Sequence, residues 1–180
     1  NMAERKINKI GVIGMGPVGT ILASHFQEAG LDVAICDLDK IKMNLVKTEG
    51  INLEGVINKK TYFKNVFTSL AELEAFKPDL IFVCVKTTQL PALVREISVL
   101  ELAKAGVVCA MNGIDVEKMI SGVIGENRTY RMVINFAGNL NAPNVTRVTF
   151  FNPPNYIASM DDSGMEVANE IAAALSGVGI

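Results

Sequence analysis

The sequence predicts an α/β fold built on a doubly wound, mainly parallel β-sheet. Short apolar runs rich in β-branched residues alternate with stretches of helical periodicity, and a glycine-rich turn joins the first run to the first helix. Hydrophobic residues make up 49% of the 180 positions and charged residues 20%, so the chain can bury a large core and lacks the composition of a disordered segment.

The first part of the chain has the pattern of a βαβ unit. Residues 9–14 are predicted to form a buried parallel strand, because they are almost entirely apolar. The helix that follows ends at Gly30 and has an apolar face made of Val18, Ile21, Leu22, Phe26 and Ala29. Residues 32–36 make the second strand, and a second helix over residues 38–47 is ended by Gly50.

The stretch over residues 51–63 breaks this rhythm. Its apolar positions suit an antiparallel excursion better than a crossover helix; they are Ile51, Leu53, Ile57 and Tyr62. Ser69 and Glu72 then form a capping box, which predicts a short helix that Pro78 closes.

The remaining pattern completes the alternation of strands and helices. We predict strands over residues 79–85, 107–111, 130–136, 145–151 and 156–160. A helix with Pro91 in its first turn carries the stripe Leu90, Leu93, Val94, Ile97 and Leu100, and a short helix covers residues 116–120. A last helix is defined by Met165, Ala168, Ile171, Ala172 and Leu175.

The bulk properties exclude several classes of function. A net charge of −2 without a basic run argues against nucleic-acid binding, which needs clustered lysine and arginine. No apolar run approaches the roughly eighteen residues that a membrane span requires. We therefore expect neither nucleic acid nor a membrane as a partner.

The start of the chain and its cysteines indicate the cellular compartment of the protein. Asn1 precedes Met2, so we interpret Asn1 as a tag remnant, and the direct entry into a strand leaves no room for a secretory signal. The cysteines lie in apolar runs, and their odd number and spacing fit neither a disulfide framework nor a zinc site: Cys36, Cys84 and Cys109. We expect buried, reduced thiols in a cytoplasmic protein.

A G-x-G-x-x-G turn follows the first strand and opens the first helix. This glycine loop consists of Gly14, Met15, Gly16, Pro17, Val18 and Gly19. The first glycine permits a tight turn, the second lets a pyrophosphate approach the backbone, and the third lets helix and strand pack closely. The helix N-terminus adds free amides and partial positive charge. The alternative is that the glycines serve packing alone; the position after a strand favours a Rossmann-type dinucleotide-binding domain over residues 2–180.

A carboxylate at the end of the second strand predicts which dinucleotide binds. Asp37 is placed to accept hydrogen bonds from the adenosine ribose hydroxyls, whereas the 2′-phosphate of NADP would meet like charge. Asp37 therefore favours NAD over NADP. The alternative is that Asp37 caps the next helix or faces solvent, with Lys40 or Lys42 neutralising a phosphate nearby.

Further motifs follow strands that we expect to end at one edge of the sheet, where ligands bind to doubly wound folds. They are Val-Cys-Val-Lys-Thr-Thr-Gln at residues 83–89, Cys-Ala-Met-Asn-Gly-Ile at 109–114, and Asn-Phe-Ala-Gly at 135–138 followed by Pro-Asn-Val at 143–145. In this order after the glycine loop, and with the excursion around residues 50–63, they resemble the ketopantoate reductase (2-dehydropantoate 2-reductase) family over nearly the whole chain.

The resemblance implies roles for individual residues. The glycine loop would hold the pyrophosphate, and Lys86 would supply positive charge beside the cofactor and an acidic substrate. Asn112 would contact the cofactor near the nicotinamide and orient the reacting groups, so Lys86 and Asn112 are candidates for supporting catalytic roles. A backbone contact near Gly138 or Asn139 is also implied. The alternatives are a solvated strand terminus for Lys86 and an ordinary turn dipeptide for Asn112 and Gly113.

His25 is the single histidine and the obvious acid–base candidate. It lies two turns into the first helix, beyond Leu22, and points away from the expected phosphate site. We therefore interpret it as a core-edge or surface histidine. The sequence shows no clustering suited to metal binding and no serine or cysteine with a triad partner.

The sequence departs from the family in two places. Where the family commonly has an arginine that holds the NADP 2′-phosphate, this chain has Asp37 and Leu38, so the resemblance implies NADP while Asp37 favours NAD. The chain also ends about where the family enters a helical second domain, which carries the lysine that acts as general acid. We expect this substrate and catalytic domain to be missing, the chain alone to bind dinucleotide with little turnover, and its exposed apolar surface to favour self-association as a homodimer.

The function that the resemblance implies is hydride transfer from NAD(P)H to a small-molecule 2-oxo acid, with ketopantoate going to pantoate on the route to pantothenate. Two alternatives stay open. One is an NAD-dependent 2-hydroxyacid dehydrogenase of related fold, which Asp37 fits better. The other is a non-catalytic dinucleotide-sensing module that acts through a partner.

Overall fold

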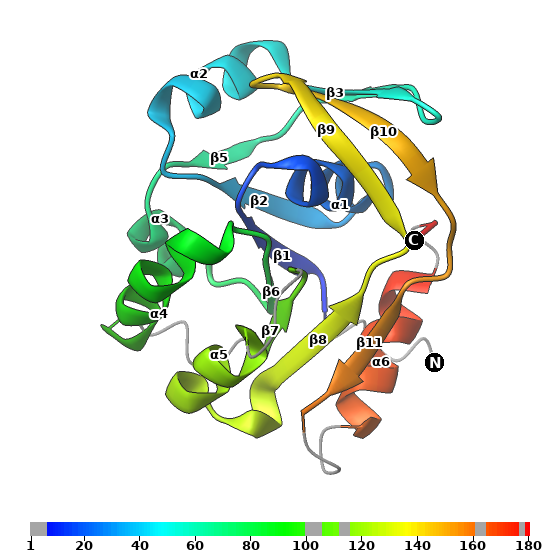
Figure 1. The fold of residues 1–180 in the computed structure, drawn as a ribbon. Helices are drawn as coiled ribbons and strands as arrows, with labels where there is room; N and C mark the ends of the chain where they lie inside the picture. Colours follow the sequence, from blue (N-terminus) through cyan, green and yellow to red (C-terminus); the bar gives the residue numbers. More distant parts are fainter. Residues whose placement is uncertain (1–6, 100–105, 112–115, 161–164, 177–178) are drawn as a thin grey trace.

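A computed structural model describes residues 7–99, 106–111, 116–160, 165–176 and 179–180. In this part of the chain, a seven-stranded sheet has helices on both faces, and a four-stranded sheet covers one of the helices (Figure 1). The predicted α/β class and doubly wound, mainly parallel sheet are confirmed.

The strand order of the large sheet identifies the edge at which folds of this kind bind ligands. Its strands are β1 (Lys9–Ile13), β2 (Asp32–Cys36), β5 (Asn65–Phe67), β6 (Leu80–Val83), β7 (Gly106–Cys109), β8 (Thr129–Val133) and β11 (Tyr156–Ser159). They are arranged β11-β8-β7-β6-β1-β2-β5, and every neighbour pairs in parallel except β8 with β11. The chain builds outward from β1 to one side and then, from β6, to the other. Folds of this kind bind ligands at the carboxyl ends of the strands beside such a reversal.

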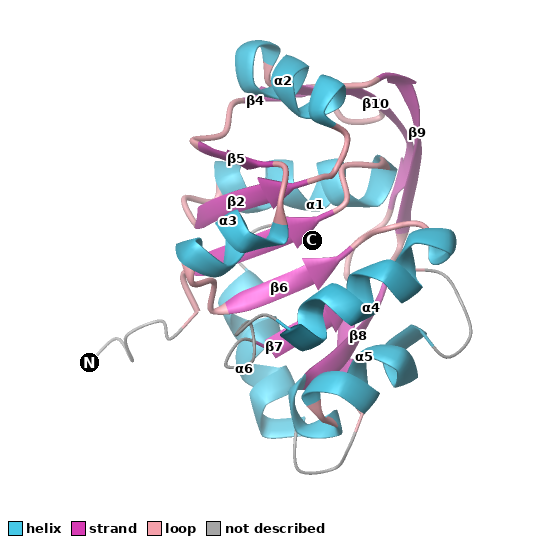
Figure 2. Ribbon diagram, turned by 90° about the vertical axis from the view of Figure 1, so that its left-hand side faces the viewer, coloured by secondary structure: helices cyan, strands magenta, loops and turns pink. Residues whose placement is uncertain are grey.

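Helices cover both faces of this sheet (Figures 1 and 2). One face carries α1 (Pro17–Glu28) and α6 (Met165–Leu175), and the other carries α3 (Leu70–Phe76), α4 (Leu90–Val99) and α5 (Val116–Ile124). The pleat of a strand directs successive side chains to opposite faces, so Ile10 and Val12 pack toward α1 while Ile13 packs toward α3 and α4. Both faces of the strands are therefore apolar, as in other buried parallel sheets.

The smaller sheet lies against α1 on the side away from the large sheet. Its strands are β3 (Ile51–Gly55), β4 (Lys59–Thr61), β9 (Phe136–Ala142) and β10 (Val145–Phe151), in the order β4-β3-β10-β9. The hydroxyls of Thr20 in α1 and Thr146 in β10 are both fully buried and form a hydrogen bond of 2.6 Å. The antiparallel pairing of β3 with β4 confirms the predicted excursion over residues 51–63.

Local capping sets the ends of two short helices. The second helix, α2 (Lys40–Glu49), begins at Lys40 rather than at residue 38 because the Asp39 carboxylate accepts a 3.0 Å bond from the Lys42 N–H. The predicted cap of α3 is present: the Ser69 hydroxyl accepts a 3.3 Å bond from the Glu72 N–H and donates a 3.0 Å bond to the Glu72 carboxylate. Hydrogen bonds from Thr68 and Ser69 hold the pKa of Glu72 below its usual value.

Two strands differ from the sequence predictions. β5 is an edge strand of three residues that pairs with β2, and β9 pairs with β10 although its sequence, FAGNLNA, does not alternate apolar and polar residues. Both strands form because a neighbouring strand offers backbone hydrogen-bond partners. Such pairing does not depend on residue type, so the local sequence does not reveal it. The segment predicted as one strand over residues 130–136 belongs to two strands: residues 130–133 lie in β8, and Phe136 begins β9.

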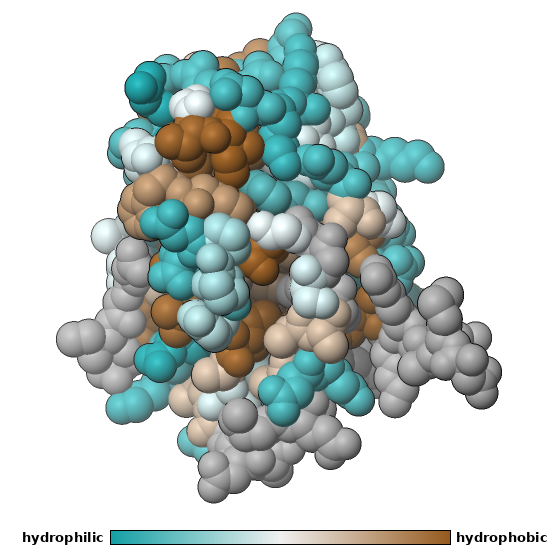
Figure 3. Space-filling view, turned by 90° about the vertical axis from the view of Figure 1, so that its right-hand side faces the viewer, coloured by the Kyte–Doolittle hydropathy of each residue, from teal (hydrophilic) through white to brown (hydrophobic). Residues whose placement is uncertain are grey.

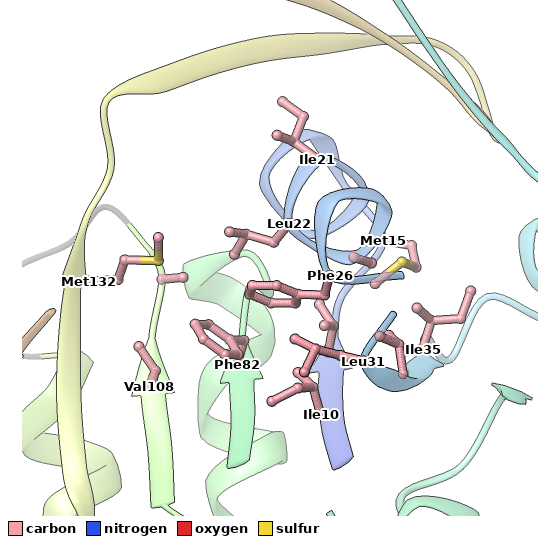
Figure 4. Packing of buried hydrophobic residues seen from close by; sticks show 14 of the residues in the cluster. Ile10, Met15, Ile21, Leu22, Phe26, Leu31, Ile35, Phe82, Val108 and Met132 are labelled. Atoms are coloured by element: carbon pink, nitrogen blue, oxygen red, sulfur yellow. The ribbon is translucent and has the colours of Figure 1, made fainter. Parts of the chain in front are cut away.

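The main core joins α1 to the centre of the sheet (Figure 4). Phe26 of α1 and Phe82 of β6 are fully buried with ring centroids 4.9 Å apart. Burying each such ring contributes about 1.5–3 kcal/mol to stability. The cysteines are free, and Cys36 and Cys109 are buried while Cys84 is half-buried, which agrees with the expected thiols in apolar strands.

Exposed apolar side chains lie where the large sheet meets the smaller one. Val133 of β8 and Tyr156 of β11 are paired neighbours and are 43% and 57% exposed, and Phe150 at the end of β10 is 45% exposed. Figure 3 shows hydrophobic atoms on this side of the molecule between hydrophilic ones. Self-association through such surface stays a prediction.

His25 lies in the core between the two sheets. Its side chain is 5% exposed, its Nδ1–H donates a 2.7 Å bond to the Ile21 carbonyl, and its ring stacks on Phe151 with centroids 5.0 Å apart. Burial lowers the pKa of His25, the Ile21 bond opposes this shift, and the charge of Lys59 adds to it. His25 is thus a core histidine held in its neutral form.

We predict that His25 makes the protein less stable in mild acid. Its pKa is lower in the folded than in the unfolded chain, so the unfolded chain binds a proton more readily as the pH falls through about 6.5. The free energy of unfolding should therefore decrease between about pH 7 and pH 5, and His25→Phe, which keeps an aromatic ring against Phe151, should reduce that decrease. Urea denaturation at both pH values measures this.

The Glu28–Lys59 ion pair of 2.6 Å provides the control for this test. Lys59 lowers the pKa of Glu28, so the contribution of Glu28 is lost only at pH values below those where His25 titrates. Glu28→Gln should not reduce the difference between about pH 7 and pH 5, because the charge of Glu28 raises the pKa of His25 and its removal leaves that pKa low. An identical decrease in wild type and His25→Phe would contradict the assignment.

Candidate functional site

The glycine loop lies at the carboxyl edge of the large sheet, between β1, β2 and β6. At its start, Gly14 has φ +97°, and its N–H donates a 2.8 Å bond to the Cys36 carbonyl at the end of β2. On the other side, the Cys84 N–H donates a 2.8 Å bond to the Ile13 carbonyl. The turn is therefore anchored to both neighbouring strands before it enters α1, at the edge where the arrows of the parallel strands end in Figure 2.

The three glycines of the loop are required for different reasons. A Cβ on Gly14 would lie 2.8 Å from the Cys84 backbone, in a backbone conformation that already favours glycine. A Cβ on Gly19 would overlap the Gly14 carbonyl oxygen. Gly16 has an ordinary φ of −83°, and a Cβ there would meet no atom within 4 Å. Packing explains Gly14 and Gly19 but leaves Gly16 facing open space.

The N-terminus of α1 is not capped by a side chain. Gly16 is the N-cap residue and has no side chain to offer, Pro17 follows at the first helical position, and no acidic residue lies in the first turn. The first N–H groups of a helix have no partner within the helix, and the helix dipole gives this end a partial positive charge. The free amides suit an anion in the space in front of Gly16.

The Met15 peptide is held on both sides by charged groups. Its N–H donates a 2.8 Å bond to Asp37 Oδ2, and its carbonyl accepts a 3.0 Å bond from Lys42 Nζ. Asp37 Oδ1 accepts a further 2.9 Å bond from the Asp39 N–H. Asp37 therefore braces the glycine loop, while the capping role belongs to Asp39. The alternative in which Asp37 caps α2 or faces solvent is wrong.

A pocket of about 300 Å³ opens beside the loop on the α4 face of the sheet. We call it the edge pocket. Its apolar walls are Ile13, Cys36, Leu38, Leu70, Val85, Ala92 and Leu93. Gly14 contributes backbone, and the polar lining residues are Asp37, Thr88, Gln89 and Glu96. An apolar slot with a few polar groups is typical of small-ligand sites.

The structure describes Lys86 but not Asn112. Lys86 is exposed after β6, where its N–H donates a 3.3 Å bond to the Gln89 side chain, and it does not line the edge pocket. It lies on the same sheet edge as the glycine loop, because Cys84 and Val85 are in contact range of Gly14. Asn112 lies outside the described residues, beyond β7, whose end pairs with the end of β6.

Asn139 belongs to the smaller sheet. It is exposed on β9 opposite Arg147, next to Gly138, which is opposite Val148. Neither Asn139 nor Gly138 lines the edge pocket. The structure thus brings Asp37 directly onto the glycine loop and places Asn139 in a separate layer.

Glu96 was not among the residues expected at the site, whereas Gln89 ends the predicted motif of residues 83–89 and Lys42 was expected only as a partner of a phosphate. The spacing of Gln89, Ala92, Leu93 and Glu96 is that of one helical face, and all four line the edge pocket. This face was visible in the sequence as the polar margin of the apolar stripe of α4. The contact of Lys42 with the Met15 carbonyl had no such signal, because it depends on how α2 returns to the loop.

Metal and membrane sites find no support in the described part of the chain. No group of three or more His, Cys, Asp or Glu side chains among the described residues could hold a metal ion. None of the described helices is long and apolar enough to cross a membrane.

The chain matches the family model of ketopantoate reductase PanE/ApbA over residues 10–162. It belongs to the ketopantoate reductase family. The matched segment includes the glycine loop, the edge pocket and both sheets, and among the described helices it leaves out only α6. The family resemblance of the sequence motifs is therefore confirmed.

Relatives of this ketopantoate reductase family member match at low identity. The 2-dehydropantoate 2-reductase of Streptococcus pyogenes is 24% identical over 165 residues, which are 92% of this chain and 52% of that protein. The UDP-N-acetyl-D-mannosamine dehydrogenase of Methanococcus maripaludis is 35% identical over 99 residues, 50% of this chain and 21% of that protein. The chain spans about half the length of the 2-dehydropantoate 2-reductases that it matches.

Solved structures share the fold. A D-mandelate dehydrogenase in a ternary structure with NADH and anilino(oxo)acetate superposes with a TM-score of 0.82 at 22% identity, over 95% of this chain and 55% of that chain. A 2-dehydropantoate 2-reductase from Geobacter metallireducens gives 0.79 at 19% identity, over 96% and 56%. At these identities the likeness shows a shared fold.

The glycine geometry predicts opposite outcomes for two alanine substitutions. Gly19→Ala places a methyl group on the Gly14 carbonyl and should lower the free energy of unfolding by about 2 kcal/mol or more. Gly16→Ala meets no neighbour at an ordinary φ and should change it by less than about 1 kcal/mol. Denaturant titration of the two variants measures the difference. Equal destabilisation of both would show that the loop is packed differently.

Proposed function

We propose that the chain binds NAD(P)H and forms the cofactor-binding part of an oxidoreductase that reduces a 2-oxo acid. The observation that carries this proposal is Gly16, where glycine stands although neither φ nor packing within the chain requires it. The open space in front of it lies at the uncapped N-terminus of α1. A pyrophosphate accepts hydrogen bonds from free backbone amides at such a position, and it needs a backbone without a side chain to come close.

The edge pocket is the proposed site of the adenosine. It extends from Gly14 and Asp37 to the apolar side chains of Leu70 and Leu93, which suit the faces of a base. Each Asp37 oxygen accepts one backbone N–H and keeps a lone pair for a ribose hydroxyl. A 2′-phosphate at this place would meet the carboxylate, which supports NAD in preference to NADP.

Lys42 would favour NADP rather than NAD. Its ammonium carries three donors, of which the contact with the Met15 carbonyl uses one. A 2′-phosphate near Asp37 would therefore have a cation at hand, and the family resemblance also favours NADP. The preference for NAD is proposed because Asp37 lines the pocket and Lys42 does not.

The reacting end of the cofactor is proposed to lie near Lys86 and Asn112. Lys86 is exposed at the same sheet edge as the glycine loop, where its charge would attract phosphates or the carboxylate of a 2-oxo acid. Asn112 would orient the reacting groups, and Asn139 would add a backbone contact. When bound, the reduced nicotinamide supplies the hydride to the carbonyl carbon. Because the chain spans about half the length of related reductases, the proposal assigns the proton donor to the other half.

The proposed substrate is ketopantoate, which would be reduced to pantoate. Its support is membership in the ketopantoate reductase family and the similarity to 2-dehydropantoate 2-reductases. A second candidate is an NAD-dependent 2-hydroxyacid dehydrogenase, which Asp37 favours and whose fold is represented by the D-mandelate dehydrogenase solved with NADH.

Dinucleotide binding is tested by filling the space in front of Gly16. Gly16→Ala should weaken NADH binding by about tenfold or more, because the methyl group occupies the approach of the pyrophosphate while the fold is unaffected. Calorimetric titration of wild type and variant measures the change. Gly122→Ala in α5 is the matched control, because a Cβ there also meets no atom within 4 Å, and it should bind NADH like wild type. Wild type that binds neither NADH nor NADPH would sink the proposal.

The cofactor preference is tested by neutralising Asp37. Asp37→Asn keeps a side-chain oxygen for the Met15 N–H and removes the charge that a 2′-phosphate would meet. Wild type should bind NADH more tightly than NADPH, and the variant should reduce that preference by about tenfold, since screening leaves only part of the repulsion between like charges. Titrations with both cofactors give the ratio. Tighter NADPH binding by wild type would refute the preference for NAD.

A further inference from the structure

Glu96 reaches the edge pocket from α4. Gln89, Ala92, Leu93 and Glu96 share one helical face, and each lines the pocket. Gln89 ends the 3-10 turn just before α4, and a helix rises about 1.5 Å per residue, so Glu96 lies roughly 10 Å beyond Gln89. Glu96 is exposed and still lines the pocket, so it lies at the rim.

The edge pocket has an acidic character. Among the described residues that line it, Asp37 and Glu96 are acidic and none is basic. Cys36, a wall of the pocket, senses both charges: burial raises its pKa to about 12, and the charges of Asp37, Glu72 and Glu96 add to the shift. The pocket therefore favours a ligand that carries hydrogen-bond donors and no negative charge.

A carboxylate accepts hydrogen bonds and donates none. With the ribose hydroxyls at Asp37, Glu96 can accept a bond from another donor of the ligand. The exocyclic N6 amine of adenine lies across the ring system from the nitrogen that carries the ribose. A base between Leu70 and Leu93 with its ribose at Asp37 thus directs its amine away from Asp37 and toward the rim of the pocket.

We propose that Glu96 is a specificity-determining residue that accepts a hydrogen bond from the N6 amine of adenine and so selects adenine over 6-oxopurines. The inference rests on the proposed function, because it requires a dinucleotide with its ribose at Asp37. Gln89 is a weaker candidate for this role, because its side-chain oxygen already accepts a 3.3 Å bond from the Lys86 N–H. Glu96 is the remaining charged acceptor of the α4 wall.

The test compares NADH with reduced nicotinamide hypoxanthine dinucleotide, which has a carbonyl in place of the amine. The purified 180-residue chain should bind NADH about three- to tenfold more tightly, the range expected for one hydrogen bond at a partly exposed site. Glu96→Gln should bring the ratio close to one, because an amide accepts from the amine and also donates to the carbonyl. Glu170→Gln makes the same charge change at an exposed position of α6 and should keep the wild-type ratio.

The outcomes separate this inference from the proposed function. Equal or tighter binding of the hypoxanthine dinucleotide by wild type overturns the role of Glu96 alone, since the carboxylate then meets the N1–H of that base or does not meet the base. An unchanged ratio in Glu96→Gln overturns it as well. Failure of wild type to bind either dinucleotide overturns both proposals.

Discussion

The site depends on the backbone of one residue, Met15, which is held between two opposite charges. The Met15 N–H is fixed by the Asp37 carboxylate and its carbonyl by the Lys42 ammonium, at 2.8 and 3.0 Å. Hydrogen bonds to charged groups are stronger than neutral ones, so this brace fixes the peptide before Met15 through its N–H and the peptide before Gly16 through its carbonyl. The loop then leaves its outer side bare and turns the first amides of α1 outward.

Contacts with both sheets hold α1 in place, so the N-terminus of the helix is fixed relative to the braced loop. On one side Phe26 packs on Phe82 of the large sheet, and on the other the Thr20 hydroxyl meets Thr146 of the smaller sheet. Thr20 also donates to the Gly16 carbonyl at 2.8 Å, within the first turn. A helix fixed from both layers cannot shift its N-terminus without disturbing both cores. The smaller sheet thus supports the loop indirectly, through the helix that the loop opens.

Local sequence predicted those parts of the fold that local chemistry determines. The glycine loop, the strands β1, β2 and β10 and the cap of α3 follow from residues within a few positions of one another. β9 could not be predicted in this way, because its partner β10 supplies the pairing. The same holds for the Asp37 contact: its position at the end of β2 was predictable, but its bond to Met15 joins residues that only the fold brings together.

The proposed function gives Asp37 two tasks, and they constrain each other. Its position lets it recognise a ribose, yet both of its oxygens already accept backbone N–H groups that shape the loop. A residue that binds a 2′-phosphate, such as arginine, has hydrogen-bond donors only. It would leave the Met15 N–H without its acceptor. Arginine at this position alone would therefore gain a partner for a phosphate but remove the acceptor that shapes the loop. A chain that moved to NADP would need a new acceptor for Met15, or would use Lys42 while keeping the carboxylate in place.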